Sequence, residues 1–256
     1  MITESFDNKS PAVIDPVTKK NAVKCDVVIV TFSNHIEQHV VNTFDVEKVV
    51  ELVCVNGITP AYIFKHNGKT FGFLKTLLGS AAAVGTLEDA VNFFECDKIL
   101  VFGSAGTLDK NHYGKVMVPT FAYRDEGTSY HYKEASDYIE IKNSNIVADF
   151  MNKNNIPFVL GKCWTTDAFY RETKNNLKKR QDDGCVSVDM ECSAIQAMCD
   201  FREVNLFYFF LSGDLLDSPK WIRDGLNEAN HNFQNFQIAL KLACDLCEVW
   251  LCKDYI

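Results

Sequence analysis

The sequence predicts a single α/β domain with a mostly parallel central sheet flanked by helices. Short runs rich in β-branched residues alternate with helical stretches, which is typical of parallel strands joined by helices. The run at 206–211 is almost continuously apolar, as strands buried on both faces are. No repeat, low-complexity tract or obvious linker interrupts the 256 residues, so one domain over 1–256 is expected.

Each element follows from local spacing and from turn or cap residues. The motif HNGK at 66–69 predicts a hairpin turn between two strands, and Ser144 is a candidate helix N-cap. The predicted strands are 26–30, 52–55, 61–64, 70–74, 98–102, 115–123, 157–163, 186–190 and 206–211. The predicted helices are 79–96, 144–154, 172–180, 192–202 and 226–251.

Composition and charge narrow the classes of partner. The net charge of −8 argues against nucleic acid or an anionic membrane. The N-terminus lacks the pattern of a secretory signal, and no apolar run is long enough to span a bilayer, so a cytoplasmic protein is expected. The ten cysteines are scattered, and the C-x-x-C pair Cys244 and Cys247 has no second pair at zinc-ribbon spacing. We therefore expect free thiols, no metal and no cofactor.

Candidate site residues are those that follow the predicted strands, because ligands bind at the carboxyl ends of strands in such sheets. Gly103 to Gly106, with Ser104, offer backbone N–H groups and a hydroxyl to an anion or a sugar oxygen. The alternative is a purely structural turn. Arg124 lies in the segment 123–132 among carboxylates, hydroxyls and rings, which is either part of a site or a polar surface loop.

Three later segments carry rings and carboxyl groups. Phe169 and Tyr170 offer a stacking wall for a flat heterocycle, or they close a hydrophobic corner. Glu191 can accept two O–H bonds from a diol, while Met190 presses on a sugar face or belongs to the core. Asp214 follows the most apolar strand, where partial burial raises a pKa and suits a carboxyl group to general-acid catalysis; the alternative is a cap or turn.

Together, the order and spacing of these segments resemble the nucleoside phosphorylase/nucleosidase superfamily, which includes purine nucleoside phosphorylases, uridine phosphorylases and methylthioadenosine nucleosidases. The resemblance runs from about residue 11 to about residue 221. It is most specific in VFGSAGTLDK (101–110), YRDEGTSYHY (123–132), WTTDAFYRET (164–173) and VDMECSA (188–194). It implies a twisted sheet partly closed like a barrel, and a homodimer or a hexamer made of three dimers.

The resemblance also implies a role for each candidate residue. Asp214 matches the aspartate that protonates the leaving purine, and the positions near Thr173 and Asn175 lack the Gln and Arg with which uridine phosphorylases read uracil. A purine nucleoside is therefore the expected substrate, cleaved with inorganic phosphate as co-substrate to free base and ribose 1-phosphate. The other matches are the ribose-binding Glu191 and Met190, the base-lining Phe169 and Tyr170, and Gly103 and Ser104 of the phosphate-binding turn.

The arginines with which hexameric phosphorylases bind phosphate are missing. Val101 stands at one of these positions, and the loop 31–36 reads TFSNHI. A phosphate dianion without a cationic partner is held weakly, so Arg124 and Arg171 are the candidate substitutes. Nucleosidases of the superfamily lack the arginine before this turn and use water. Two alternatives therefore stand beside a phosphorylase: a nucleoside hydrolase of the same fold, and a nucleoside-binding protein that has lost catalysis.

Overall fold

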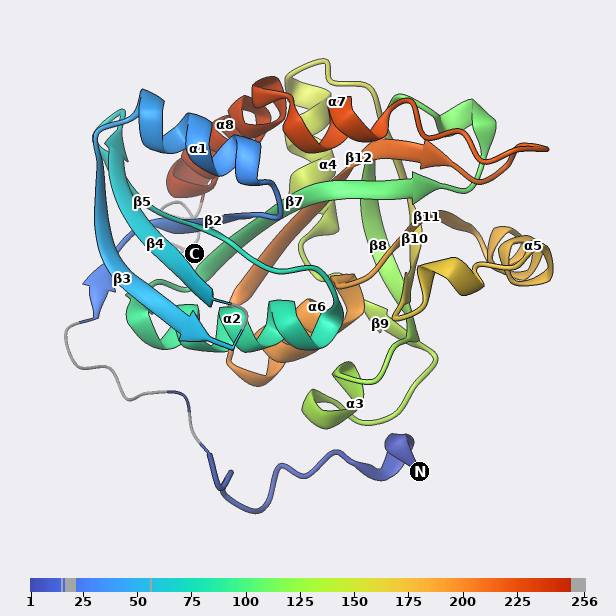
Figure 1. Ribbon diagram of the computed structural model, residues 1–256, viewed down its shortest axis with the longest axis horizontal. Coiled ribbons are helices and arrows are strands. Elements are labelled where there is room, and N and C mark those ends of the chain that lie inside the picture. The colour runs from blue at the N-terminus through green and yellow to red at the C-terminus, as the bar shows by residue number, and fades with distance from the viewer. Residues whose placement is uncertain (15, 17–21, 56, 250–256) are drawn as a thin grey trace.

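The computed structural model describes residues 1–14, 16, 22–55 and 57–249, in which strands and helices alternate (Figure 1). The strands are β1 (Val23–Lys24), β2 (Val27–Thr31), β3 (Val46–Cys54), β4 (Gly57–His66), β5 (Lys69–Lys75), β6 (Phe94–Glu95), β7 (Lys98–Thr107), β8 (Val116–Asp125), β9 (Tyr138–Glu140), β10 (Phe158–Thr166), β11 (Cys185–Asp189) and β12 (Asn205–Leu215). The helices are η1 (Ile2–Glu4), α1 (Asn34–Thr43), α2 (Ser80–Phe93), η2 (Lys110–His112), α3 (Ser129–Tyr132), α4 (Ser144–Lys153), η3 (Phe169–Arg171), α5 (Lys174–Asp182), α6 (Cys192–Phe201), α7 (Leu226–His231) and α8 (Phe233–Val249).

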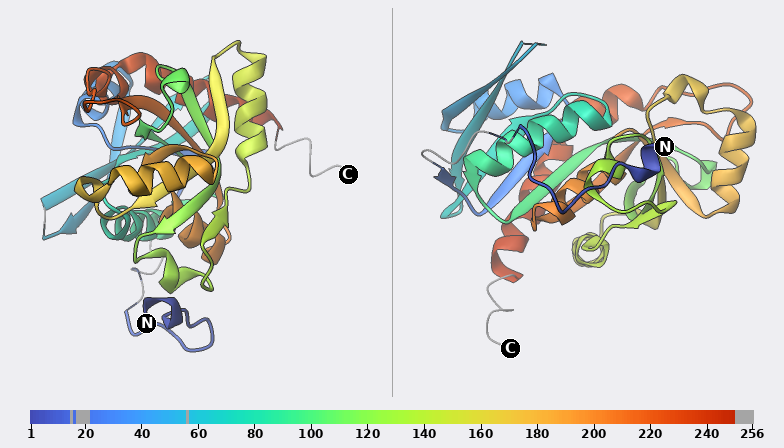
Figure 2. Two further views of the ribbon diagram at one scale, coloured as in Figure 1. Left: turned by 90° about the vertical axis from the view of Figure 1, so that its right-hand side faces the viewer. Right: turned by 90° about the horizontal axis from the view of Figure 1, so that it is seen from below.

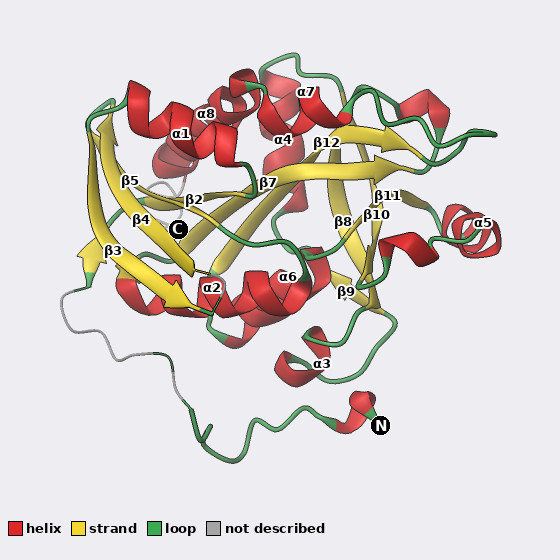
Figure 3. Ribbon diagram, viewed as in Figure 1, coloured by secondary structure: helices red, strands yellow, loops and turns green. Residues whose placement is uncertain are grey.

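The central sheet closes on itself at one end. Among the described residues it has the order β11-β10-β8-β12-β7-β2-β5-β4-β3, with β9 beside β8. An additional antiparallel pairing, Ser187 with Thr107 and Val188 with Gly106, joins β11 back to β7. The strands β7, β12, β8, β10 and β11 therefore form a barrel, and β2, β5, β4 and β3 extend from it as an open wing (Figure 3). The predicted α/β class with a partly closed sheet is confirmed.

The barrel and the wing each combine parallel and antiparallel strand pairs. Parallel pairing joins β2 to β5 and β7, β7 to β12, and β10 to β8 and β11. The ladders β7–β11 and β8–β12 and the hairpin ladders of the wing are antiparallel. Parallel strands at the centre bring the ends of β2, β7 and β12 to one side of the molecule, as the crevice rule for α/β sheets requires.

Helices cover both faces of the sheet (Figure 1, Figure 2). Val28 and Val30 of β2 belong to the core cluster shared with α2 and α6, while Val27 and Ile29 belong to the cluster shared with α1, α4 and α8. Side chains of a strand alternate between its faces, so a strand that is apolar at every position is buried on both sides. This double burial explains why the central strands are visible in the sequence as unbroken apolar runs.

Two helices differ from the sequence prediction. The segment 34–43 forms α1, which the sequence analysis did not predict; its N-cap Ser33 accepts an N–H bond from Ile36 at 3.2 Å. The long helix predicted at 226–251 is divided into α7 and α8 at Asn232, whose backbone is extended. Asn232 Oδ1 accepts the N–H of Gln234 at 2.9 Å, a local bond that competes with helix continuation. Positions 250 and 251 lie outside the described residues.

Candidate active site

The segment Gly103–Gly106 lies inside β7, and not in the turn that the sequence predicted. β7 continues to Thr107 and pairs with β12 along this whole stretch. On the opposite edge, β2 pairs with residues 99–101 of β7, and β11 pairs with residues 106 and 107. In the ladders of the described residues, 102–105 therefore have one unpaired edge. Backbone polar groups on such an edge need partners, so this opening between β2 and β11 is a place for a polar ligand.

An aromatic ring borders this opening. Phe32 directly follows β2, and a Cβ built on Gly103 would lie only 2.8 Å from Phe32 Cδ2. Glycine is therefore needed at 103 for the ring to approach β7 so closely. Val101, the position that carries an arginine in hexameric phosphorylases, is fully buried in the core. The border of the opening at Gly103 is thus apolar.

The connection from β11 to α6 holds Glu191 in a buried position. The N–H of Gly79 donates to Glu191 Oε1 at 2.5 Å, and Ser80 Oγ donates to the carbonyl of Met190 at 2.7 Å. Burial, and next the charge of Asp189, raise the pKa of Glu191 to about 8. The start of α2 therefore binds the backbone of Met190 and the side chain of Glu191. These bonds fix the position of the carboxyl group that the sequence analysis assigned to ribose.

Asp189 shapes this connection, and the sequence analysis gave it no role. Its carboxylate accepts the Thr165 hydroxyl at 2.7 Å and the backbone N–H groups of Glu191 and Cys192 at 2.9 and 2.7 Å. A buried carboxylate held by several donors fixes the backbone around it. The sequence could have indicated this role, because Asp189 lies at the end of a buried strand and two residues before Glu191.

Asp214 lies within β12, past an irregularity of the ladder between Ser212 and Asp214. The indole N–H of Trp221 donates to Asp214 Oδ2 at 2.5 Å. Burial raises the pKa of Asp214, and the bond from Trp221 opposes this rise. Burial, and then the charge of Asp214, raise the pKa of Glu172 to about 7. A carboxyl group that holds its proton toward neutral pH is suited to general-acid catalysis. The sequence analysis identified neither Trp221 nor Glu172.

The aromatic wall expected at 169–170 is present and exposed. Phe169 and Tyr170 lie in η3 with ring centroids 4.1 Å apart, and they are 48% and 84% exposed. Trp221, on the loop after β12, is 58% exposed. Aromatic side chains that the core does not use are available to stack on a heterocycle.

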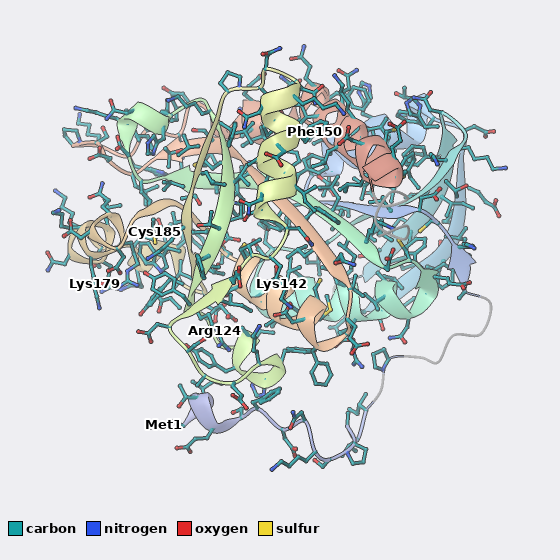
Figure 4. The ribbon with its side chains drawn as sticks, turned by 180° about the vertical axis from the view of Figure 1, so that it is seen from behind. Met1, Arg124, Lys142, Phe150, Lys179 and Cys185 are labelled. Atoms are coloured by element: carbon teal, nitrogen blue, oxygen red, sulfur yellow. The ribbon has the colours of Figure 1, made fainter. Side chains whose placement is uncertain are left out.

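The two candidate substitute cations do not join the opening in β7. Arg124 uses its guanidinium within one loop, donating to Ser129 Oγ at 2.8 Å and to the carbonyls of Glu134 and Lys133 at 2.7 and 3.2 Å. Figure 4 shows Arg124 beside α3. Arg171 is exposed in η3, and no bond from its side chain to β7 occurs in the described residues. The phosphate role considered for these arginines thus gains no geometric support.

Ladder geometry brings the remaining candidates to one opening. Gly106 pairs with Asp214 in β12 and with Val188 in β11, two residues before Met190. A Cβ built on Gly213 would lie 3.1 Å from Ser104 Cβ, which places the Asp214 segment directly against Ser104. The electrostatic effect of Asp214 on Glu172 links the acid to the end of η3. Asp214 and Ser104 therefore lie together at β7, Glu191 follows the strand that pairs with Gly106 from the other side, and Glu172 links Asp214 to the end of η3.

Other features of the described residues lie elsewhere. One surface hollow is lined by residues that include Asp109 and Gln181, and another by residues that include Lys142 and Gln196. No group of three or more His, Cys, Asp or Glu side chains in the described part of the chain is arranged to hold a metal ion. Within those same residues, no helix is both long and apolar enough to cross a membrane.

Three similarities to known proteins accompany this geometry. The chain is 26% identical over 164 residues to an uncharacterised protein of Acanthamoeba polyphaga mimivirus, covering 62% of this chain and 64% of that protein. It is 23% identical over 185 residues to a DeoD-type purine nucleoside phosphorylase of an Exiguobacterium species, covering 70% and 76%. The Campylobacter jejuni 5'-methylthioadenosine/S-adenosyl homocysteine nucleosidase has the same fold, with a TM-score of 0.69, 16% identity, and coverage of 88% of this chain and 99% of that one.

A family model decides the membership. The model of the phosphorylase superfamily matches residues 26–248, which include every strand of the barrel and every candidate residue named above. With the shared fold and the match over nearly all of the described chain, the protein belongs to the phosphorylase superfamily of nucleoside phosphorylases and nucleosidases.

Proposed function

We propose that this protein cleaves the N-glycosidic bond of a purine nucleoside, with Asp214 as the general acid and Glu191 as the ribose ligand. The observation that carries the proposal is that β12, with Asp214, and β11, which leads to Glu191, flank Gly106 of β7 from its two sides, next to Ser104. Bond cleavage leaves positive charge on the sugar and negative charge on the base. A proton from Asp214 neutralises the negative charge on the base, and the carboxyl group of Glu191, hydrogen-bonded to the ribose hydroxyls, orients the sugar on which the positive charge develops.

The base would lie against Phe169 and Tyr170, whose exposed rings offer a stacking surface. A purine suits this arrangement, because its ring nitrogen can accept a proton from Asp214, whose pKa is raised by burial. Met190 is half-buried beside Glu191 and would contact the sugar. No cofactor is needed for this chemistry, since the acid and the ribose ligand are side chains of the chain itself.

We propose water as the nucleophile, in preference to phosphate. Phe32 packs on Gly103, Val101 is buried, and the guanidinium of Arg124 is occupied by its own loop. A dianion at the edge of β7 would have an aromatic ring where a cation is needed, and such a site binds phosphate poorly. Water carries no charge to neutralise, and Ser104 with the unpaired edge of β7 supplies hydrogen-bond partners for it.

Phosphorolysis is the second candidate. It is favoured by the similarity to a purine nucleoside phosphorylase over 70% of this chain and by the Gly103–Ser104 segment, which matches the phosphate-binding motif. In this case the product is ribose 1-phosphate in place of free ribose. Both candidates need the same acid and the same ribose ligand, so they differ only at the nucleophile.

The test is release of free base from inosine, adenosine, guanosine and uridine, each with and without ~50 mM phosphate, an excess over common substrate constants. We expect release from a purine nucleoside that does not depend on phosphate and yields free sugar. Asp214→Asn should lose about 10²–10⁴-fold in kcat while it retains nucleoside affinity. Phosphate-dependent release would establish the second candidate. Tight nucleoside binding with no turnover would instead identify a binding protein and refute both.

A further inference from the structure

We infer that Trp221 is a positioning residue for the general acid, and that its indole N–H selects Asp214 Oδ1 as the oxygen that carries the transferred proton. This inference rests on the proposed function. It starts from a specific contact, the Trp221 Nε1–H bond to Asp214 Oδ2 at 2.5 Å. An indole N–H only donates, and the better acceptor on a protonated carboxyl group is its carbonyl oxygen, so the contact favours Oδ2 as the oxygen without the proton.

The loop that carries Trp221 is anchored directly after the acid. Leu215 and Ile222 form an isolated antiparallel bridge, with N–H···O bonds of 2.8 and 3.4 Å. The N–H of Leu216 also donates to the carbonyl of Thr107 on β7 at 3.0 Å. Trp221 precedes the bridge residue Ile222, so the fold brings the indole back to the strand that holds Asp214. These backbone hydrogen bonds therefore hold Trp221 close to Asp214.

Burial does not explain a tryptophan at this position. The side chain is 58% exposed, so its removal from water contributes little to the core. Its polar atom is bound to Asp214, the carboxyl group proposed as the general acid. By contrast, the indole of Trp164 also donates to a carboxylate, Asp125, at 2.9 Å, but that side chain is 1% exposed and belongs to the core.

The other oxygen of Asp214 faces β7. A Cβ built on Gly106 would lie 3.2 Å from Asp214 Oδ1, and it would also meet Leu216 Cδ1 and Val188 Cγ1 at 2.7 and 2.8 Å, so glycine lets this oxygen approach the backbone of β7 closely. With Oδ2 accepting from the indole, a protonated Asp214 carries its hydrogen on Oδ1, on the side of β7. The contact thus fixes both the orientation of the carboxyl group and the oxygen that donates.

A test of this contact must leave the neighbouring charged groups unchanged. Glu172 interacts electrostatically with Asp214, and the Arg223 guanidinium lies 5.5 Å above the Trp221 ring. On the same loop, Asp217 accepts the N–H of Lys110 at 3.3 Å. Trp221→Phe keeps an aromatic ring and all of these charges while it removes the N–H. Lys220→Gln, at the neighbouring exposed position, is the matched control.

The experiment compares two leaving groups, a purine and p-nitrophenolate, on ribosides cleaved by the same enzyme. Nitrophenolate departs without a proton, so it does not need the acid. We expect Trp221→Phe to lower kcat for the purine nucleoside about 10-fold and for p-nitrophenyl riboside less than about 3-fold, with Lys220→Gln unchanged on both. The ratio of the two rates does not depend on the fraction of enzyme that folds. If Trp221→Phe does not fold at all, Trp221→Leu also lacks the N–H and replaces it.

Two further readouts separate positioning from a structural role. In an Asp214→Asn background, Trp221→Phe should have no further effect on kcat, because the residues act as one unit. Loss of the N–H donor raises the pKa of Asp214, so the alkaline limb of the kcat profile should move to higher pH. Equal losses on both substrates, or additive losses in the double variant, would overturn the role of Trp221. Wild-type enzyme that cleaves no nucleoside would refute the proposed function itself.

Discussion

Glu191 shows at the scale of one residue how much stability a buried carboxyl group can cost. It is 5% exposed and receives an N–H bond from Gly79, yet burial and the neighbouring Asp189 hold its pKa at about 8. Its ordinary value is 4.5, so folding takes up a proton between these two values. The contribution of Glu191 to stability is therefore lost as pH rises from about 4.5 through about 8.

Glu191→Gln should consequently stabilise the fold at alkaline pH while it abolishes nucleoside cleavage. We expect a Tm about 2–4 °C above wild type at pH 8, the shift that ~1 kcal/mol produces in a protein of this size. At pH 5 the difference should nearly vanish, because the wild-type carboxyl group is then protonated. Thermal unfolding followed by circular dichroism measures both. Glu47→Gln, an exposed position on β3, is the control, and a lower Tm for Glu191→Gln at both pH values would contradict this explanation.

The sequence was sufficient to single out two candidate site residues, and their roles stay predictions. Glu191 and Asp214 were predicted because a carboxyl group at the end of a buried strand is costly unless it has a function. Trp221 and Asp189 were not, because their roles depend on contacts with Asp214 and Thr165 that are distant along the chain or across a loop. Local spacing says nothing about which carboxylate an indole N–H meets.

At the scale of elements, β7 is the strand on which the site depends. The sequence predicted its apolar first half, 98–102, and a turn at 103–106. The turn prediction was wrong, because pairing with β12 extends the strand through Thr107 in spite of two glycines. Glycine weakens a strand locally but also permits close approach, and here Phe32 and Asp214 approach β7 at Gly103 and Gly106. A nonlocal ladder thus overrides a local turn preference.

Gly103→Ala tests that geometry. The new methyl group would lie 2.8 Å from the Phe32 ring, so we expect a loss of about 1–3 kcal/mol in the free energy of unfolding. Adding Phe32→Ala to Gly103→Ala should recover much of this loss, because the Phe32 ring is what the new Cβ would contact. Gly85→Ala in α2 is the matched control: its Cβ would meet nothing within 4 Å, and alanine favours a helix. Urea unfolding measures the free energy of unfolding of Gly103→Ala, of the Gly103→Ala/Phe32→Ala double variant and of Gly85→Ala. If Gly103→Ala loses no stability, Phe32 does not pack on β7.

Two features of the helices were also not predicted from local patterns. α1 was missed because only Ile36 and Val40 of its side chains are buried, too few for a clear apolar period. The break between α7 and α8 was missed because Phe233, Phe236 and Leu240, whose spacing indicated the helix, all lie in α8, and that spacing does not show where the helix begins. Asn232 ends one helix and bonds the next through its side chain, a local competition that apolar periodicity does not register.

At the scale of the whole molecule, closure of the barrel assembles the site. Pairing of β11 with β7 brings Val188 to Gly106, and β12 brings Asp214 to the same glycine from the other side. Residues more than 80 positions apart in the chain thus meet at one strand. The wing formed by β2, β5, β4 and β3 adds the Phe32 border and the β5–α2 connection that holds Glu191.

A homodimer, or a hexamer made of three dimers, stays a prediction for the assembled protein. Phe169, Tyr170 and Trp221 leave a largely exposed aromatic surface beside the acid in a single chain, and such a surface favours a covering partner. Light scattering on purified protein should give a mass of at least two chains of 29.0 kDa each. If the partner completes the site, specific activity should fall on dilution below the dissociation constant of the assembly. A monomer that keeps full activity at every concentration would contradict this prediction.

The sequence by itself determined the α/β class and the central strands, and it singled out Asp214 and Glu191 as candidates for the acid and the ribose ligand. These depend on local patterns: apolar runs buried on two faces, and carboxyl groups placed where such runs end. Only the tertiary structure decided that 103–106 is a strand edge, that Arg124 is used by its own loop, and that Trp221 holds Asp214. Each of these is a hydrogen bond or ladder between segments that pattern reading treats separately, and its partner exists only once the barrel has closed.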